Sequence, residues 1–394
     1  MSDTADDTFL DAGLAPSAAV RRSRWLLSGY FAGQGVIMAT WATRMPAVKE
    51  AVGISPGKLS IALLAASLGM IVMLGVSGRI AERPRGTPRL LIGAALTLGS
   101  SLVLLAQVAS FVPLVAVAAL FGCGQGLLLV PLNAAGVTCQ RRYGRPIMAS
   151  LHATYSTGAV GAAAIATATA GFSHTVVFTT VGATVIIATL ITAPIALSLT
   201  GAEAPTAASD QAIRRRGMVW LLGVMVAAGL ICEGTALDWS AVHLRSLGAG
   251  ATAAAAAYFA YGAGMAVGRL MGDRLTVRLG PQRLLRTSAV VAAMGLGAGL
   301  AATSTPIAAP AALIGWALLG VGLSPVVPLL YSEAGSHGPR AVASVSTIGN
   351  IGLLAGPAAV GGIATAASLP LALTVPVVLA AGLALASRAV TTRR

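Results

Sequence analysis

Residues Gly122–Gly161 read GCGQGLLLVPLNAAGVTCQRRYGRPIMASLHATYSTGAVG, and residues Gly320–Gly362 read GVGLSPVVPLLYSEAGSHGPRAVASVSTIGNIGLLAGPAAVGG. Both stretches contain, in the same order, a Gly-x-Gly, an apolar run interrupted by proline, a short basic turn, an Ala-Ser pair and spaced glycines. Gly122 matches Gly320, and Gly124 matches Gly322. A chain of 394 residues that repeats at about half its length is predicted to consist of two homologous halves.

Composition places these halves in a membrane. The chain is 56% hydrophobic and 10% charged, which is typical of a polytopic membrane protein. Apolar stretches long enough to cross a bilayer as helices are found at 26–48, 59–80, 90–109, 111–137, 147–171, 175–199, 218–241, 250–271, 282–302, 307–333, 340–363 and 370–388.

The twelve spans form two groups of six, separated by a polar segment. The sequence predicts a disordered N-terminal tail at 1–24, a six-helix bundle at 25–200, a linker at 201–217, a second six-helix bundle at 218–389 and a short tail at 390–394. The fold class predicted is therefore all-α, with two pseudo-symmetric bundles.

Positive charge is concentrated in the loops of one face. Of 26 basic residues, four lie on the opposite face (Arg44, Lys49, Lys58 and Arg245). The other 22 lie on the first face, among them Arg269 in the eighth-to-ninth connection. The positive-inside rule then places both termini and the linker in the cytoplasm. This distribution indicates membrane topology rather than nucleic-acid binding.

Acidic residues at two span ends are candidates for gating. After span two the chain reads GRIAERPRGTPRLL, and after span eight it reads GRLMGDRLTVRLGPQRLL. Glu82–Arg83 therefore corresponds to Asp273–Arg274 with a one-residue slip. An acid flanked by arginines at a helix end can pair across a bundle and hold neighbouring helices in one conformation.

The loop after span two resembles the signature of the major facilitator superfamily, Gly-x-x-x-Asp-Arg-x-Gly-Arg-Arg, with Glu82 in the acidic position and Pro84 inserted. Asn133, the Arg145-Pro-Ile-x-Ala-Ser-x-His152 segment and Gly356-Pro357 resemble the fucose-permease-like branch, in particular YbjJ-like inner-membrane proteins. The resemblance implies a transporter of small polar solutes in a bacterial cytoplasmic membrane. Symporters of that branch carry acids in spans one and four, where this chain has none.

Span seven contains two carboxylates that can take the place of the missing acids of spans one and four. Glu233 lies in the body of the span, where an ionised side chain is costly unless it faces water or a partner. It is the candidate for proton coupling, and a structural hydrogen bond is the alternative. Asp238, further outward, is the candidate gate partner of Arg44 in span one or of Arg245; a snorkelling interfacial charge is the alternative for Arg44.

Polar and aromatic residues at similar depth in several spans are candidates for substrate binding, since a midplane site between the halves is expected. They are Gln34, Gln125, Tyr155, Tyr258, Tyr261, Trp316 and Asn350. Asn133 and His152 flank the turn between spans four and five. They are candidate gating residues, and the alternative is a hydrogen bond from His152 to Asn133 or to a backbone carbonyl that holds the turn.

Three functions follow from these patterns. The first is proton-coupled transport of a sugar-like solute or organic metabolite by alternating access. The second is proton-antiport efflux of an amphipathic drug-like compound, and the third is a non-transporting receptor or scaffold. No phosphate-binding loop, metal cluster or paired nucleophile and base is evident, so neither enzyme activity nor a cofactor or metal is expected. The expected partners are solute, protons and lipids, and the expected state is a monomer.

Overall fold

The structure is a computed structural model that describes residues 16–169, 171–199 and 209–389. The first bundle contains α1(Ala18–Val52), α2(Pro56–Ala81), α3(Gly86–Leu105), α4(Phe111–Tyr143), α5(Met148–Ala168) and α6(His174–Leu197). The second contains α7(Ser209–Ser246), α8(Ala251–Leu279), α9(Pro281–Ala301), α10(Ala308–Leu323), α11(Val326–Ser336), α12(Pro339–Ala366), α13(Leu369–Ala372) and α14(Thr374–Ala386), with 3₁₀ turns η1(Ala302–Ser304) and η2(Ser387–Ala389).

These helices correspond to the twelve predicted spans. The tenth span is divided into α10 and α11 at Ser324-Pro325, and the twelfth into α13 and α14 at Leu373. Within the described residues, nine segments are long and apolar enough to cross a membrane by length and composition alone. The other three spans are α1, α5 and α8. The fold is the predicted one, with six spans in each bundle.

Two predicted boundaries were wrong. Helix α1 begins at Ala18, capped by the Ser17 hydroxyl, so residues 18–24 are helical rather than a disordered tail. Helix α7 begins at Ser209 and takes in the second part of the predicted linker. Residues 1–15, 201–208 and 390–394, which the remaining tail and linker predictions concern, lie outside the described residues.

The repeated Gly-x-Gly explains the packing of each bundle. A Cβ atom on Gly122 of α4 would overlap the Ala66 carbonyl oxygen of α2, and one on Gly320 of α10 would overlap the Tyr261 carbonyl oxygen of α8. The second glycine of each pair faces the next helix: Gly124 contacts α3, and Gly322 contacts α9. Small residues let helix backbones approach closely in a membrane. The same glycines therefore bring together equivalent helices in the two halves.

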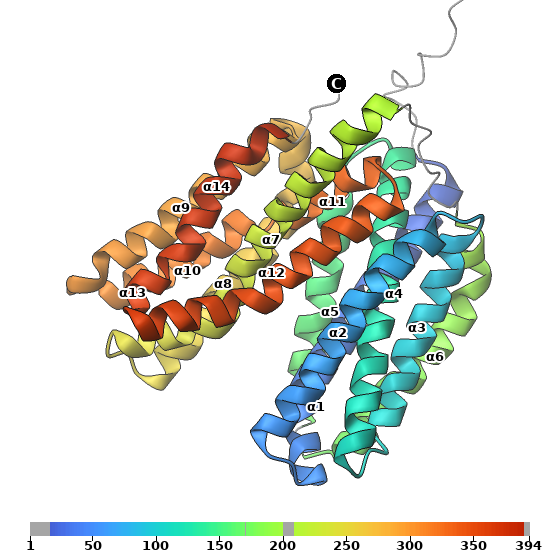
Figure 1. The fold of residues 1–394 in the computed structure, drawn as a ribbon, viewed down its shortest axis with the longest axis horizontal. Coiled ribbons are helices and arrows are strands. Elements are labelled where there is room, and N and C mark those ends of the chain that lie inside the picture. Colours follow the sequence, from blue (N-terminus) through green and yellow to red (C-terminus); the bar gives the residue numbers. More distant parts are fainter. Residues whose placement is uncertain (1–15, 170, 200–208, 390–394) are drawn as a thin grey trace, which may run out of the picture.

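The two bundles meet at one end and diverge toward the other (Figure 1). At the meeting end, α2 packs on α12, α5 packs on α8, and α11 contacts α4 and α5. This end, defined by the start of α5, the end of α8 and the α11–α12 turn, is called the converging end below. The opposite end carries the α1–α2 and α7–α8 turns and is called the outer end.

Candidate functional site: an inter-bundle gate and the layer beneath it

The first contact between the bundles joins α2 to α12. Glu82 Oε2 lies 2.7 Å from Arg340 Nε, and the exposed fractions of the Glu82 and Arg340 side chains are 18% and 68%. Helix packing supports this pair, since a Cβ on Gly78 would lie only 2.6 Å from the Ala343 Cβ. The acid at the end of the second span therefore binds the opposite bundle.

The second contact is its counterpart in the other half. Asp273 Oδ1 and Oδ2 accept hydrogen bonds from the backbone N–H groups of Ala149 at 3.0 Å and Ser150 at 3.2 Å. These N–H groups belong to the first turn of α5, where helical N–H groups lack partners within their own helix. Gly272 allows this approach, because a Cβ there would lie 2.6 Å from the Ala149 Cβ.

Burial and hydrogen bonding have opposite effects on the pKa of the Asp273 carboxyl. Asp273 lies beyond the predicted span 250–271, at the end of α8. Burial raises the pKa of its carboxyl, and hydrogen bonds from Ser150 and Ala149 oppose that rise in part. The net gain from this contact is therefore smaller than two charge-assisted hydrogen bonds would suggest.

The sequence placed both acids at span ends but did not predict their partners, which lie in the opposite bundle. Glu82 pairs with Arg340 and Asp273 binds backbone, whereas Arg83 and Arg274 take part in neither contact. A gating role for the four residues stays a prediction.

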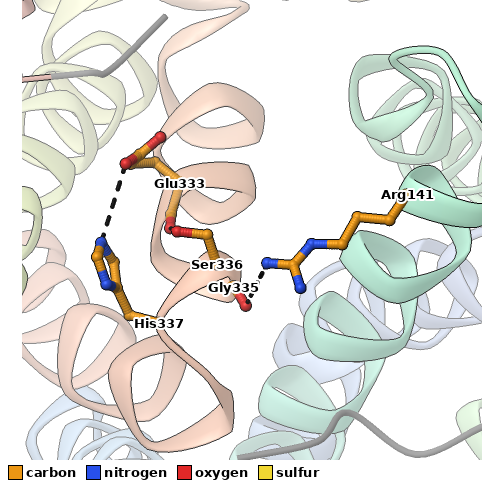
Figure 2. Close-up of polar contacts among 5 residues, drawn as sticks. All are labelled: Arg141, Glu333, Gly335, Ser336 and His337. Atoms are coloured by element: carbon orange, nitrogen blue, oxygen red, sulfur yellow. Dashed lines mark hydrogen bonds and ion pairs between the residues drawn. The ribbon is translucent and has the colours of Figure 1, made fainter. Parts of the chain in front are cut away.

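A third set of contacts joins α4 to α11. Gln140 Nε2 donates to Ser332 Oγ at 2.7 Å, while its Oε1 accepts from the Ile147 and Met148 backbone N–H groups. Figure 2 shows Arg141 reaching from α4 to the Gly335 carbonyl oxygen, a contact of 3.5 Å at the long end of the hydrogen-bond range. Gln140 therefore links the start of α5 to the second bundle.

On the other side of the same α11 segment, Glu333 and His337 face each other, with His337 Nε2 3.9 Å from Glu333 Oε1 (Figure 2). None of the residues that join α4 to α11 was among the sequence candidates.

Beneath these inter-bundle contacts lies a layer of aromatic and charged side chains, called here the buried layer. It consists of Phe31, His152, Tyr155, Ser156, Glu233, Tyr261, Arg269 and Tyr331. His152 stacks on Tyr331 across the two bundles, with ring centroids 6.3 Å apart, and contacts Phe31 at 5.1 Å. Its Nε2 is buried without a hydrogen-bond partner among the described residues.

Arg269 is the cation of this layer. Its side chain is 8% exposed, and Nη1 donates to Ser156 Oγ at 2.6 Å, across the boundary between the bundles. The sequence assigned Arg269 to a loop, and the structure corrects this: it lies inside α8, two helical turns from Tyr261 on the same face.

Glu233 is half-buried, and among the described residues its carboxylate makes no hydrogen bond or ion pair. The charges of Glu233 and Arg269 both act on Tyr155 and Tyr261, so these four side chains share one neighbourhood. An acid in this position is accessible to a proton or a cationic group without breaking an existing bond.

The remaining substrate candidates divide into two groups. Gln34 Nε2 donates to Gln125 Oε1 at 3.2 Å, and Gln125 Nε2 contacts Met38 Sδ at 2.8 Å, so the first bundle contains an amide pair between α1 and α4. Tyr258 is 52% exposed and lies one turn from Tyr261. A substrate role for these residues is untested.

Other predicted residues have different surroundings. Trp316 is 0% exposed, and its Nε1 donates to His243 Nδ1 at 3.2 Å, so it packs inside the second bundle and cannot contact solute in this state. Asn350 is buried and donates to the Ser346 carbonyl oxygen. Asn133 donates to the Leu129 carbonyl oxygen of its own helix. Its Oδ1 and His152 Nε2 are buried without partners among the described residues, so the predicted hydrogen bond between Asn133 and His152 is not formed.

The predicted gate between Arg44 and Asp238 is not formed. Arg44 is 6% exposed, and its Nη2 donates to the carbonyl oxygens of Ala166 and Thr169 and to Thr169 Oγ1. It therefore satisfies carbonyl groups at the C-terminal end of α5, where a cation is favoured. Asp238 is exposed, and Arg245 donates to the Ala249 carbonyl oxygen.

Two helical bundles related by a repeated helix pattern, with contacts between them at one end, define the class of duplicated membrane carriers. The family model of the Major Facilitator Superfamily matches residues 26–339. The chain belongs to this superfamily and is a transporter of that family.

Relatives and solved structures agree with this assignment. An uncharacterized MFS-type transporter of Yersinia pestis is 32% identical over 373 residues, which cover 93% of this chain and 94% of that protein. The crystal structure of the MFS transporter FucP in the outward conformation aligns with a TM-score of 0.78 at 14% identity, over 93% of this chain and 98% of that one. The proton:xylose symporter XylE aligns with a TM-score of 0.72 at 13% identity, over 94% and 95%.

Proposed function

We propose that this protein is a secondary active transporter that moves a small polar solute across the cytoplasmic membrane by alternating access, coupled to protons. The observation that carries the proposal is the position of the inter-bundle contacts. Glu82–Arg340, Asp273 with the start of α5, and Gln140–Ser332 all lie at the converging end, while the bundles diverge toward the outer end (Figure 1). Rocking about the buried layer exchanges one open end for the other.

The arginines support an orientation. Among the described residues, the basic side chains near the converging end include Arg83, Arg85, Arg89, Arg142, Arg278 and Arg283. Under the positive-inside rule this end is cytoplasmic, and the state described is closed toward the cytoplasm. Labelling of single cysteines at Arg283 and at Gln107 with a membrane-impermeant reagent tests this. In intact cells the proposal requires modification at Gln107 and protection at Arg283, and the reverse pattern contradicts it.

Glu233 is the proposed proton carrier. It is half-buried, free of hydrogen bonds among the described residues, and lies close to tyrosines that belong to both bundles. A carboxyl group that alternates between water on two sides can load a proton on one side and release it on the other. The proton:xylose symporter XylE has the same fold, and this supports the proposal that the transported solute is small and polar.

Proteoliposomes loaded with a pH dye test the proposal. Under an inward solute gradient, acidification of the lumen identifies symport and alkalinisation of the lumen identifies antiport. No flux of any solute rejects the carrier role in favour of a scaffold. Glu233→Gln is expected to abolish proton movement while solute exchange across the membrane persists. Glu50→Gln, which removes an exposed acid near the outer end of α1, is the matched control and is expected to keep both.

A further inference from the structure

The guanidinium of Arg269 is a buried cation with little to neutralise it. Its Nη1 donates to Ser156 Oγ, which uses one of five N–H donors, and its Nε is buried without a partner among the described residues. Its side chain is 8% exposed. Burial of an ion is unfavourable unless hydrogen bonds and an opposite charge compensate it. Within the described residues no carboxylate lies within ion-pair distance of Arg269.

The repeat shows that the fold does not require this cation. Gly78-Arg79 is the sequence counterpart of Gly268-Arg269, yet Arg79 is exposed. Ser156 corresponds to Asn350, following the match of Ala149-Ser150 with Ala343-Ser344, and Asn350 donates to its own helix instead of binding an arginine. The first bundle therefore packs without an inward arginine at this position, and the second bundle has one.

Other unsatisfied polar groups surround Arg269. The Tyr261 hydroxyl and His152 Nε2 are buried without partners among the described residues. The charge of Arg269 acts on Tyr155, Tyr261 and His152, which come from α5 and α8. A hydroxyl and an imidazole N–H can each donate to an oxygen atom. Arginine with additional donors is the arrangement that proteins use to bind carboxylates and other oxyanions.

We infer that the transported solute carries a carboxylate or similar oxyanion group, and that Arg269 binds this group with help from Ser156 and Tyr261. This inference rests on the proposed carrier function and specifies its substrate class as an organic or sugar acid. A cationic solute is disfavoured at Arg269, and a neutral solute leaves the guanidinium uncompensated. Glu233, in the same neighbourhood, repels the anion while ionised, so a protonated Glu233 and an anionic solute are expected to occupy the layer together.

The first experiment uses purified full-length protein and matched solutes: glucose with glucuronate, galactose with galacturonate, and glycerol with glycerate. Ligands that bind the folded state raise the melting temperature. At least one acid is expected to raise it, while its neutral partner has a smaller effect or none. The inference is overturned if a neutral solute raises the melting temperature while its acid does not. It is also overturned if none of the three acids raises the melting temperature.

The second experiment measures uptake of the active acid into proteoliposomes by variants of one helix. Arg269→Gln is expected to weaken apparent affinity about 10- to 100-fold, the range for loss of a hydrogen bond to a charged group. The apparent affinity of Arg269→Lys is expected to lie between those of Arg269→Gln and the original protein, because lysine keeps the positive charge but lacks the paired N–H donors of the guanidinium. Arg278→Gln, which removes an exposed arginine of α8, is expected to have no effect.

A merely structural latch between α8 and α5 gives a different result. Ser156→Ala breaks the Arg269–Ser156 hydrogen bond and leaves the cation in place. If Arg269 only fastens the helices, Ser156→Ala and Arg269→Gln lower the melting temperature alike, neither changes the preference for acid over neutral solute, and the inference is wrong. Uptake of a neutral solute alone refutes the anion site but keeps the carrier, whereas no uptake of any solute refutes the carrier as well.

Discussion

Loss of the Asp273 carboxylate is expected to open the converging end. In Asp273→Ala the first turn of α5 loses two hydrogen bonds, those of the Ala149 and Ser150 backbone N–H groups. A hydrogen bond to a charged group contributes about 1.5–3 kcal/mol, and a carboxylate at a helix N-terminus contributes about 0.3–1 kcal/mol. Burial of the carboxyl offsets part of this gain.

We therefore expect the closed state to lose about 1–3 kcal/mol, which shifts the equilibrium between closed and open by about 5- to 150-fold. The Glu82–Arg340 pair is more exposed, with Arg340 68% exposed, so Glu82→Gln is expected to cost about 1 kcal/mol or less. The relative size of the two effects tests the account more directly than either value alone. Asp273→Ala is expected to open the converging end more than Glu82→Gln does.

Spin labels at Arg89→Cys and Arg283→Cys report the separation of the bundles at this end, since these exposed residues begin α3 and α9. The three native cysteines are replaced in the background. Asp273→Asn, which keeps one acceptor oxygen, is the matched control and is expected to be intermediate. An unchanged distance distribution in Asp273→Ala, or a larger change in Glu82→Gln, would refute this account of the gate.

Two further predictions concern packing and capping. Gly122→Ala places a methyl group against the Ala66 carbonyl oxygen and is expected to lower the stability of the folded protein by about 1–3 kcal/mol, measured as a lower melting temperature. Gly29→Ala is the control and should be neutral, because nothing lies within 4 Å of the added carbon; equal effects of the two variants would contradict the packing argument. Arg44→Leu removes the cation that binds the end of α5 and is expected to lower the stability of the folded protein by about 1–3 kcal/mol. The melting temperature should fall while the direction of proton movement is retained. Loss of proton coupling with an unchanged melting temperature would favour a gating role instead.

The sequence predicted the fold because the determinants of the fold are local and repeated. Each Gly-x-Gly specifies close contact at a fixed place in its own half, and Gly122 and Gly320 indeed pack against equivalent helices. The positions of the spans follow from hydrophobicity in the same direct way. The helix starts at Ala18 and Ser209 and the breaks at Ser324-Pro325 and Leu373 were not predicted.

Partners of polar residues were harder to predict, because they depend on which helices face each other across the bundles. Arg44 was expected to pair with an acid and instead binds backbone carbonyl groups of α5, which no side-chain pattern reveals. Arg269 was assigned to a connection by analogy with its repeat counterpart Arg79, which is an exposed residue in the last turn of α2, whereas Arg269 is buried within α8. The available signal was helical spacing: Tyr261, Met265 and Arg269 recur every four residues, and all three are buried.

Alternating access requires that the two ends move in opposite directions. A second label pair, Gln107→Cys and Thr305→Cys, reports the outer end in the loops after α3 and α9. With both pairs measured in Asp273→Ala, the account predicts that the outer distance shortens as the converging distance lengthens. If the converging end opens while the outer end stays apart, or if neither distance responds, the bundles do not rock about the buried layer and the central claim fails.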